Sequence, residues 1–74
     1  MKDWREQYDY VRYFYEDRAG VRIGTKYGHV DKQGNITTPI IYNDVGPFRE
    51  GKAKVRLGDR YFYVDKNGKE IKEE

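Results

Sequence analysis

An internal duplication constrains the fold of this chain more than any other feature of its sequence. A shift of 34 residues aligns residues 8–37 with residues 42–71 without a gap. Of the 30 aligned positions, 13 hold the same residue in both copies: Tyr8/Tyr42, Val11/Val45, Phe14/Phe48, Glu16/Glu50, Ala19/Ala53, Val21/Val55, Arg22/Arg56, Gly24/Gly58, Tyr27/Tyr61, Val30/Val64, Asp31/Asp65, Lys32/Lys66 and Gly34/Gly68. Self-similarity at a fixed period indicates a fold built from repeated units. We therefore predict a single domain over residues 1–74, with repeat 1 at residues 8–41 and repeat 2 at residues 42–74.

Each copy has the pattern of antiparallel β-strands. Apolar residues alternate at Ala19, Val21 and Ile23, before a Gly24-Thr25 pair and a second β-rich run, and the second copy repeats this pattern. Alternation favours a strand with one buried face, and glycine followed by a small polar residue favours a two-residue hairpin loop. The stretches "VDKQGN" and "VDKNGK" place Asp first and Gly last around a turn. The expected fold class is all-β: a small antiparallel domain of about five to seven strands, built from two β repeats.

The predicted hairpin register sorts the side chains between two faces. It places Arg22 opposite Tyr27, and Arg56 opposite Tyr61, as exposed cation–π pairs. It places His29 on the same polar face as Tyr27, so we expect an exposed or partly buried strand histidine.

One aligned pair suggests how the two copies pack. Gly28 in the first copy corresponds to Phe62 in the second, so we expect Phe62 to fill the space beside Gly28. Since two repeats are fewer than an open array needs, the sheet should close on itself as a roll or barrel. A monomer or a homodimer is the expected state.

The N-terminal segment departs most from the repeat. Trp4, Tyr8, Val11 and Tyr15 recur at helical spacing, so a short N-terminal helix is an alternative to a strand there. The aromatic residues of this segment either cap the end of the core or form an interface; the sequence leaves both readings open.

The run from residue 26 to residue 71 resembles the WG repeats, a bacterial family of β-rich repeats, and the resemblance extends over about residues 19–71, more weakly over residues 8–18. The matching positions are Tyr27-Gly28, Val30-Asp31, Gly34, Pro39, Tyr42, Phe48, Glu50-Gly51, Ala53 and Val55. Tyr27 and Tyr61 stand where the family's Trp usually sits, and Phe62 replaces its Gly. The resemblance implies a repeat scaffold that mediates interactions, without catalytic residues to transfer.

Little catalytic chemistry is available. The chain has neither Ser nor Cys, and His29 is its one histidine, which excludes Ser–His–Asp and Cys–His sites. A single His is also a poor basis for a zinc or iron site. We expect no enzymatic activity, no metal and no cofactor. Because the first residues contain no apolar segment, we expect no signal peptide, no membrane association and a cytoplasmic location.

Two groups of residues are candidates for binding a partner. The first is the N-terminal group, which the duplication does not explain: Trp4, Tyr10, Arg12, Tyr13 and Tyr15. The second is a basic, aromatic strand face: Lys54, Arg56, Tyr61 and Tyr63. Tyr and Arg dominate interface hot spots, so the first interpretation is a protein-binding module, such as a stoichiometric inhibitor or adaptor, for example a phage or mobile-element anti-defence factor. The alternative is a module that binds single-stranded nucleic acid or RNA through the basic face.

Overall fold

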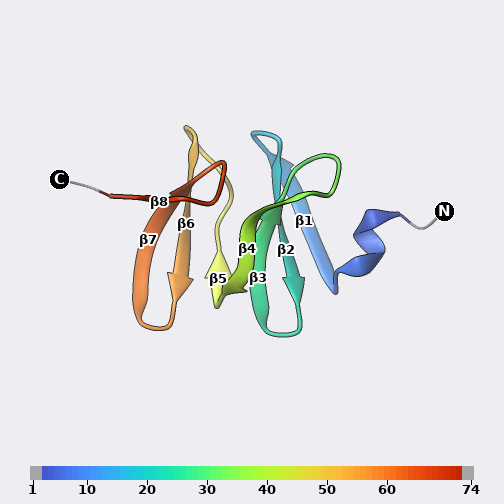
Figure 1. Cartoon of the computed structure of the whole chain (residues 1–74), viewed down its shortest axis with the longest axis horizontal. Helices are drawn as coiled ribbons and strands as arrows, with labels where there is room; N and C mark the ends of the chain where they lie inside the picture. Colours follow the sequence, from blue (N-terminus) through green and yellow to red (C-terminus); the bar gives the residue numbers. More distant parts are fainter. Residues whose placement is uncertain (1–2, 73–74) are drawn as a thin grey trace.

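The computed structural model describes residues 3–72. The elements, in chain order, are the 3₁₀ turn η1 (Trp4–Gln7) and the strands β1 (Tyr10–Tyr15), β2 (Arg18–Ile23), β3 (Lys26–Val30), β4 (Ile36–Tyr42), β5 (Asp44–Val45), β6 (Lys52–Leu57), β7 (Arg60–Asp65) and β8 (Glu70–Ile71). Strands β1 to β4 form one antiparallel sheet and β5 to β8 form another, here sheet 1 and sheet 2. Figure 1 shows the two sheets side by side, with η1 next to β1. The all-β prediction is confirmed.

The local turns are those that the sequence predicts. Arg22 lies opposite Tyr27 and Arg56 lies opposite Tyr61, so both hairpins have the expected two-residue loops. The Asp31 carboxylate accepts hydrogen bonds from the backbone N–H groups of residues 33 and 35, both at 2.9 Å. Asp65 accepts the equivalent pair from residues 67 and 69, at 2.9 and 3.0 Å. The same hydrogen bonds recur 34 residues apart, so the pseudo-symmetry of the sequence is also present in the structure.

The expected closure into a barrel does not occur among the described residues. A single residue, Asn43, separates β4 from β5, and the chain then starts a second sheet instead of extending the first. The eight strands exceed the predicted number because the two-residue segments β5 and β8 also pair. The helical alternative at the N-terminus is right for one turn, η1, whereas Val11 and Tyr15 belong to β1.

Each sheet carries its own core, and the two cores are built from equivalent residues. The first core contains Ala19, Val21 and Val30, packed against Tyr8, Val11, Phe14, Trp4 and Ile40. The second core contains Tyr42, Val45, Phe48, Ala53, Val55 and Val64, packed against Tyr27 and Phe62. Six identical pairs of the duplication therefore supply both cores. Within residues 3–72, no helix is long and apolar enough to cross a bilayer.

The expected contact between Gly28 and Phe62 is wrong. A Cβ atom on Gly28 would lie 2.5 Å from the Thr38 carbonyl oxygen and 2.8 Å from Cγ1 of Ile40, so β4 already fills that space. Phe62 instead packs edge-on against Tyr42 in the second core, with ring centroids 5.9 Å apart. In repeat 1, Ile40 thus takes the place that Phe62 takes in repeat 2.

This close approach gives a stability prediction. We expect Gly28→Ala to lower the free energy of unfolding by about 1–3 kcal/mol, because the added methyl group would overlap backbone atoms of β4. Urea denaturation of the variant and the parent chain measures the difference. Thr25→Ala, at an exposed hairpin loop, is the control and should change little. A Gly28→Ala chain as stable as the parent would contradict the packing of β4 over this residue.

Candidate protein-binding surface

The three tyrosines of β1 project from the molecule. Tyr10 is 55% exposed, Tyr13 83% and Tyr15 50%. A register shift between Val11 and Phe14 inserts one extra residue into β1 opposite β2. Such a bulge resets the alternation of side chains. Val11 and Phe14 therefore both reach the first core, while the tyrosines around them remain accessible.

These tyrosines border a groove formed by both repeats. The groove has a volume of about 450 Å³ and lies between β1, the start of β2 and the segment that follows β5. Its lining includes four of the predicted binding residues, together with residues of both repeats: Tyr10, Arg12, Tyr13, Tyr15, Arg18, Gly20, Gly46 and Pro47. We call it the tyrosine groove.

A second hollow continues from the tyrosine groove. It has a volume of about 480 Å³ and shares Tyr15, Gly46 and Pro47 with the groove. It extends to Lys54 and Tyr63 on sheet 2. Lys54 and Tyr63, from the second group of candidate residues, thus line a hollow next to the tyrosine groove, whereas Arg56 and Tyr61 line neither.

Arg12 differs from the tyrosines because it joins the two repeats. Its guanidinium donates a hydrogen bond to the carbonyl oxygen of Val45 at 2.5 Å and lies 3.4 Å from the Asp44 carboxylate. The same group lies over the ring of Tyr27, 4.9 Å from the centroid. Arg12 thus forms part of the groove wall and also part of the contact between repeats.

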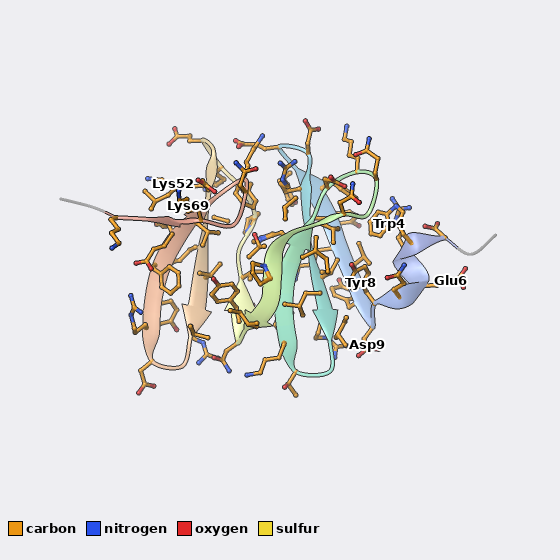
Figure 2. All side chains as sticks on the ribbon, in the orientation of Figure 1. Trp4, Glu6, Tyr8, Asp9, Lys52 and Lys69 are labelled. Carbon is orange, nitrogen blue, oxygen red and sulfur yellow. The ribbon has the colours of Figure 1, made fainter. Side chains whose placement is uncertain are left out.

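Trp4 lies in the cap of the first core, apart from the groove. Its ring meets the rings of Tyr8 and Phe14 edge-on, each at 6.2 Å between centroids, and Figure 2 shows Trp4 and Tyr8 together at this end of sheet 1. A Cβ atom on Gly34 would collide with the Trp4 side chain, just as one on Gly68 would collide with Thr37 and Thr38. Residue 4 is the counterpart of residue 38 in the 34-residue register. Trp4 therefore takes the place of a preceding repeat, as a cap.

The second candidate face belongs to sheet 2. Lys54 lies opposite Tyr63, and Arg56 opposite Tyr61, on the side of the sheet away from the second core. Together with Lys52, these residues form the outer face of sheet 2. Lys52 and Lys54 place their Nζ atoms over the rings of Tyr63 and Tyr61, at 4.9 and 5.0 Å from the centroids.

The predicted cation–π partners are therefore wrong, although the register is right. Arg22 and Arg56 donate hydrogen bonds to the carbonyl oxygens of Gly24 and Gly58, at the ends of their own hairpins. The carbonyl oxygen at the hairpin loop thus binds each guanidinium in place of the tyrosine ring on the neighbouring strand. The rings of Tyr27 and Tyr61 receive Arg12 and Lys54 instead.

His29 is a buried contact between the two repeats that the sequence did not reveal. It was expected to be exposed or partly buried, and it is fully buried. Its Nε2 atom lies 2.9 Å from the carbonyl oxygen of Gly46, and its Nδ1 atom lies 3.0 Å from Oγ1 of Thr38. Because a carbonyl oxygen only accepts, Nε2 carries the proton and donates, and Nδ1 accepts from the Thr38 hydroxyl. The ring also packs edge-on against Phe48, with centroids 4.7 Å apart.

Burial makes the charged form of His29 unfavourable. Removal from water lowers the pKa of His29 from its usual 6.5 to about 4, although the hydrogen bond to Gly46 acts in the opposite direction. Gly20 lies directly opposite His29 on β2. A glycine directly opposite a histidine leaves space on that face of the sheet. This pair was the signal in the sequence that another segment packs there.

A carboxylate adds a further link between the repeats. Glu16, in the β1–β2 turn, accepts hydrogen bonds from the backbone N–H groups of Glu50 and Gly51, at 2.6 and 2.8 Å. The bond from Gly51 is the main cause that holds the pKa of the Glu16 carboxyl below its usual value. The turn of repeat 1 thus binds the equivalent turn of repeat 2.

Comparison with known families identifies the scaffold. The sequence matches the family described as WG containing repeat over residues 7–27 and 27–61, which is more than half of the chain. The chain belongs to the WG-repeat family. The boundary between the two family matches is at Tyr27, in β3. The boundary between the two sheets is at Asn43, so the sequence repeat and the sheet do not begin at the same residue. No curated protein and no solved structure matches the chain.

The cap role of Trp4 leads to a prediction about stability. We expect Trp4→Ala to lower the free energy of unfolding by about 2–3 kcal/mol, less than for a fully buried tryptophan because Trp4 is half-buried. Thermal denaturation is the measurement, and Glu6→Ala, an exposed residue of the same turn, is the matched control. An unchanged melting temperature for Trp4→Ala would contradict the cap role. It would favour the other interpretation of the sequence, in which Trp4 is part of an interface.

The environment of His29 predicts a pH dependence of stability. Below about pH 6.5 the unfolded chain binds a proton at His29, while the folded chain stays neutral there until about pH 4. The contribution of His29 to the free energy of unfolding is therefore fully present above pH 6.5. It decreases by up to about 3 kcal/mol as the pH drops toward 4, and it does not decrease further at lower pH.

Urea denaturation at several pH values between 7 and 4 tests this dependence. His29→Gln is the informative variant, because its amide can still donate to Gly46 and does not titrate. We expect the stability of this variant to be nearly flat from about pH 7 to 5, above the range in which Glu16 and other carboxyls with a lowered pKa lose their own contribution. If it fell as steeply as that of the parent chain, His29 would not be the residue responsible.

Proposed function

We propose that this WG-repeat chain is a non-enzymatic protein-binding module that contacts its partner through the tyrosine groove. The observation that carries the proposal is the exposure of Tyr10, Tyr13 and Tyr15 on one rim. The equivalent positions in repeat 2 are Asp44, Pro47 and Arg49, so the repeat architecture does not require aromatic residues there. Exposed tyrosines offer large, rigid contact area with a hydrogen-bonding hydroxyl, as interface hot spots do.

The same proposal covers the way in which the module acts. A domain of two repeats that presents two adjoining hollows fits a stoichiometric inhibitor or adaptor, acting in the cytoplasm as a monomer or a homodimer. A phage or mobile-element anti-defence factor is one such role. Nucleic acid is the less favoured partner, because 13 acidic residues nearly balance 15 basic ones and lysines occupy the exposed faces of Tyr61 and Tyr63.

Substitution of Tyr13 tests the proposal. We expect Tyr13→Ala to weaken binding of the partner protein by about 1–3 kcal/mol, as loss of a hot-spot tyrosine does, without a marked change in melting temperature. The partner is first obtained by affinity capture of the tagged chain from host lysate, with and without nuclease, and identified by mass spectrometry. Calorimetry with the purified partner then gives the affinities.

Controls separate the possible results. Ile36→Ala is the matched variant, since Ile36 is 57% exposed and lies on β4, away from the groove. It should keep full affinity. Arg12 is unsuitable as a first test, because its loss would also disturb the contact between repeats. Undiminished binding by Tyr13→Ala would contradict the groove, and capture that nuclease abolishes would favour nucleic acid.

A further inference from the structure

Sheet 1 already holds an extended polypeptide segment on one of its faces. Residues 44–49 of repeat 2 cross this face, with Val45 over Gly20 and Phe48 against His29. A Cβ atom on Gly20 would lie 3.3 Å from Cγ2 of Val45, which shows how closely the segment approaches the sheet. The backbone of the segment pairs with β6 of its own repeat along one edge. Toward sheet 1 it is held by hydrogen bonds from Arg12 to Val45 and between His29 and Gly46. The chain therefore contains one example of how its repeat binds an extended strand.

The outer face of sheet 2 is the equivalent face of repeat 2. In the 34-residue register, Lys54 stands where Gly20 stands in sheet 1, and Tyr63 stands where His29 stands. Lys54 is exposed and Tyr63 is half-buried. A hollow of about 710 Å³ lies over this face and is lined by Lys52, Lys54 and Tyr63 among others. A segment placed here would meet an ammonium group where Val45 meets a glycine, and a tyrosine ring where Phe48 meets an imidazole.

We propose that the outer face of sheet 2 is a second docking site, which binds an extended acidic segment of a partner protein. The segment carries a carboxylate that pairs with Lys54 and, three residues later, an aromatic side chain that meets Tyr63 edge-on, as Phe48 meets His29. The spacing of three is that of Val45 and Phe48 in the segment that sheet 1 binds. The site goes beyond the tyrosine groove and shares with it only the premise that the chain binds polypeptide.

Charge favours this occupant. Lys52, Lys54 and Arg56 alternate along β6, so their side chains share the outer face. Asp65 lies opposite Lys52, but its carboxylate already accepts hydrogen bonds from two backbone N–H groups of its own turn. Glu70 lines the same hollow but pairs with Arg60 at 3.5 Å. Among residues 3–72, the ammonium groups of Lys52 and Lys54 pair with no carboxylate, so these two lysines are available to an anionic ligand.

Two other occupants are less compatible with the face. Stacked nucleic-acid bases need open aromatic faces, and the lysine Nζ atoms lie over both tyrosine rings. A second copy of the chain cannot add itself as a further repeat through its N-terminal end, because Trp4 covers the first core there. An acidic peptide needs neither an open ring face nor an uncapped repeat.

Titration with a designed peptide tests the proposal. The probe is the fluorescently labelled hexapeptide Asp-Glu-Gly-Pro-Phe-Asp, which is segment 44–49 with Val45→Glu and Arg49→Asp. The full chain is titrated into it and fluorescence anisotropy is recorded. We expect saturable binding that becomes about tenfold weaker with Lys54→Glu, because one attractive charge pair becomes repulsive. Lys26→Glu, at an exposed lysine on β3, is the matched control and should bind as the parent does.

A charge exchange makes the result specific. The same peptide with Lys in place of Glu should bind the Lys54→Glu chain better than it binds the parent. Replacing the peptide Phe by Ala should weaken binding to the parent chain. Tyr13→Ala should leave peptide binding unchanged, so failure of the tyrosine groove and failure of this face are distinguishable.

Several outcomes would overturn the proposal. These are absence of saturable binding, equal binding by the Lys54→Glu chain, and loss of peptide binding with Tyr13→Ala. An oligothymidine that binds more tightly than the peptide and is released by Lys54→Glu would assign the face to single-stranded nucleic acid instead. Circular dichroism of each variant confirms that the fold is kept.

Discussion

The contact of residues 44–49 with sheet 1 is the interaction on which the rest of the structure depends. Sheet 2 alone would leave one side of the second core open to water, since a single repeat does not enclose its own apolar residues. Sheet 1 closes that side, with Tyr27 against the core and His29 against Phe48. The absence of a side chain at Gly20 allows the approach. Around it, Arg12 and Glu16 satisfy backbone groups of the second repeat, so packing and hydrogen bonding act together.

The two ends of the stack are completed in different ways. At the first end, Trp4 takes the position that Thr38 holds between the repeats, and one large aromatic ring covers the first core. At the other end, Lys54 and Tyr63 replace the small or buried residues that would receive another repeat. A lysine side chain at that point keeps a segment farther from the sheet than Val45 is from Gly20, where a Cβ atom would lie 3.3 Å from Cγ2 of Val45. The positions at which the two copies differ in sequence therefore supply both the capping residue and candidate binding residues.

The tyrosine groove is a product of both repeats. Its tyrosines come from β1, and its opposite wall comes from Gly46 and Pro47, which reach this place because repeat 2 stacks on sheet 1. The buried His29, in turn, holds Gly46 in position through its Nε2–H. The shape of the candidate site is thus linked to the interface between the two repeats.

The sequence by itself determined the repeat period, the hairpins, the turns and the core pairs Ala19/Ala53 and Val21/Val55, because these depend on local chain geometry and on alternation along a strand. Ile23 and Leu57 continue the same alternation but are exposed, at the hairpin ends that no other segment covers. The aspartate-capped turns, for example, are closed by bonds that span four residues or fewer. Only the tertiary structure decided which segment covers which face: that Trp4 is a cap, that Arg12 bridges the repeats, and that His29 is buried instead of exposed. The physical reason is that alternation separates a strand's two faces but carries no information about the distant segment that packs on each of them.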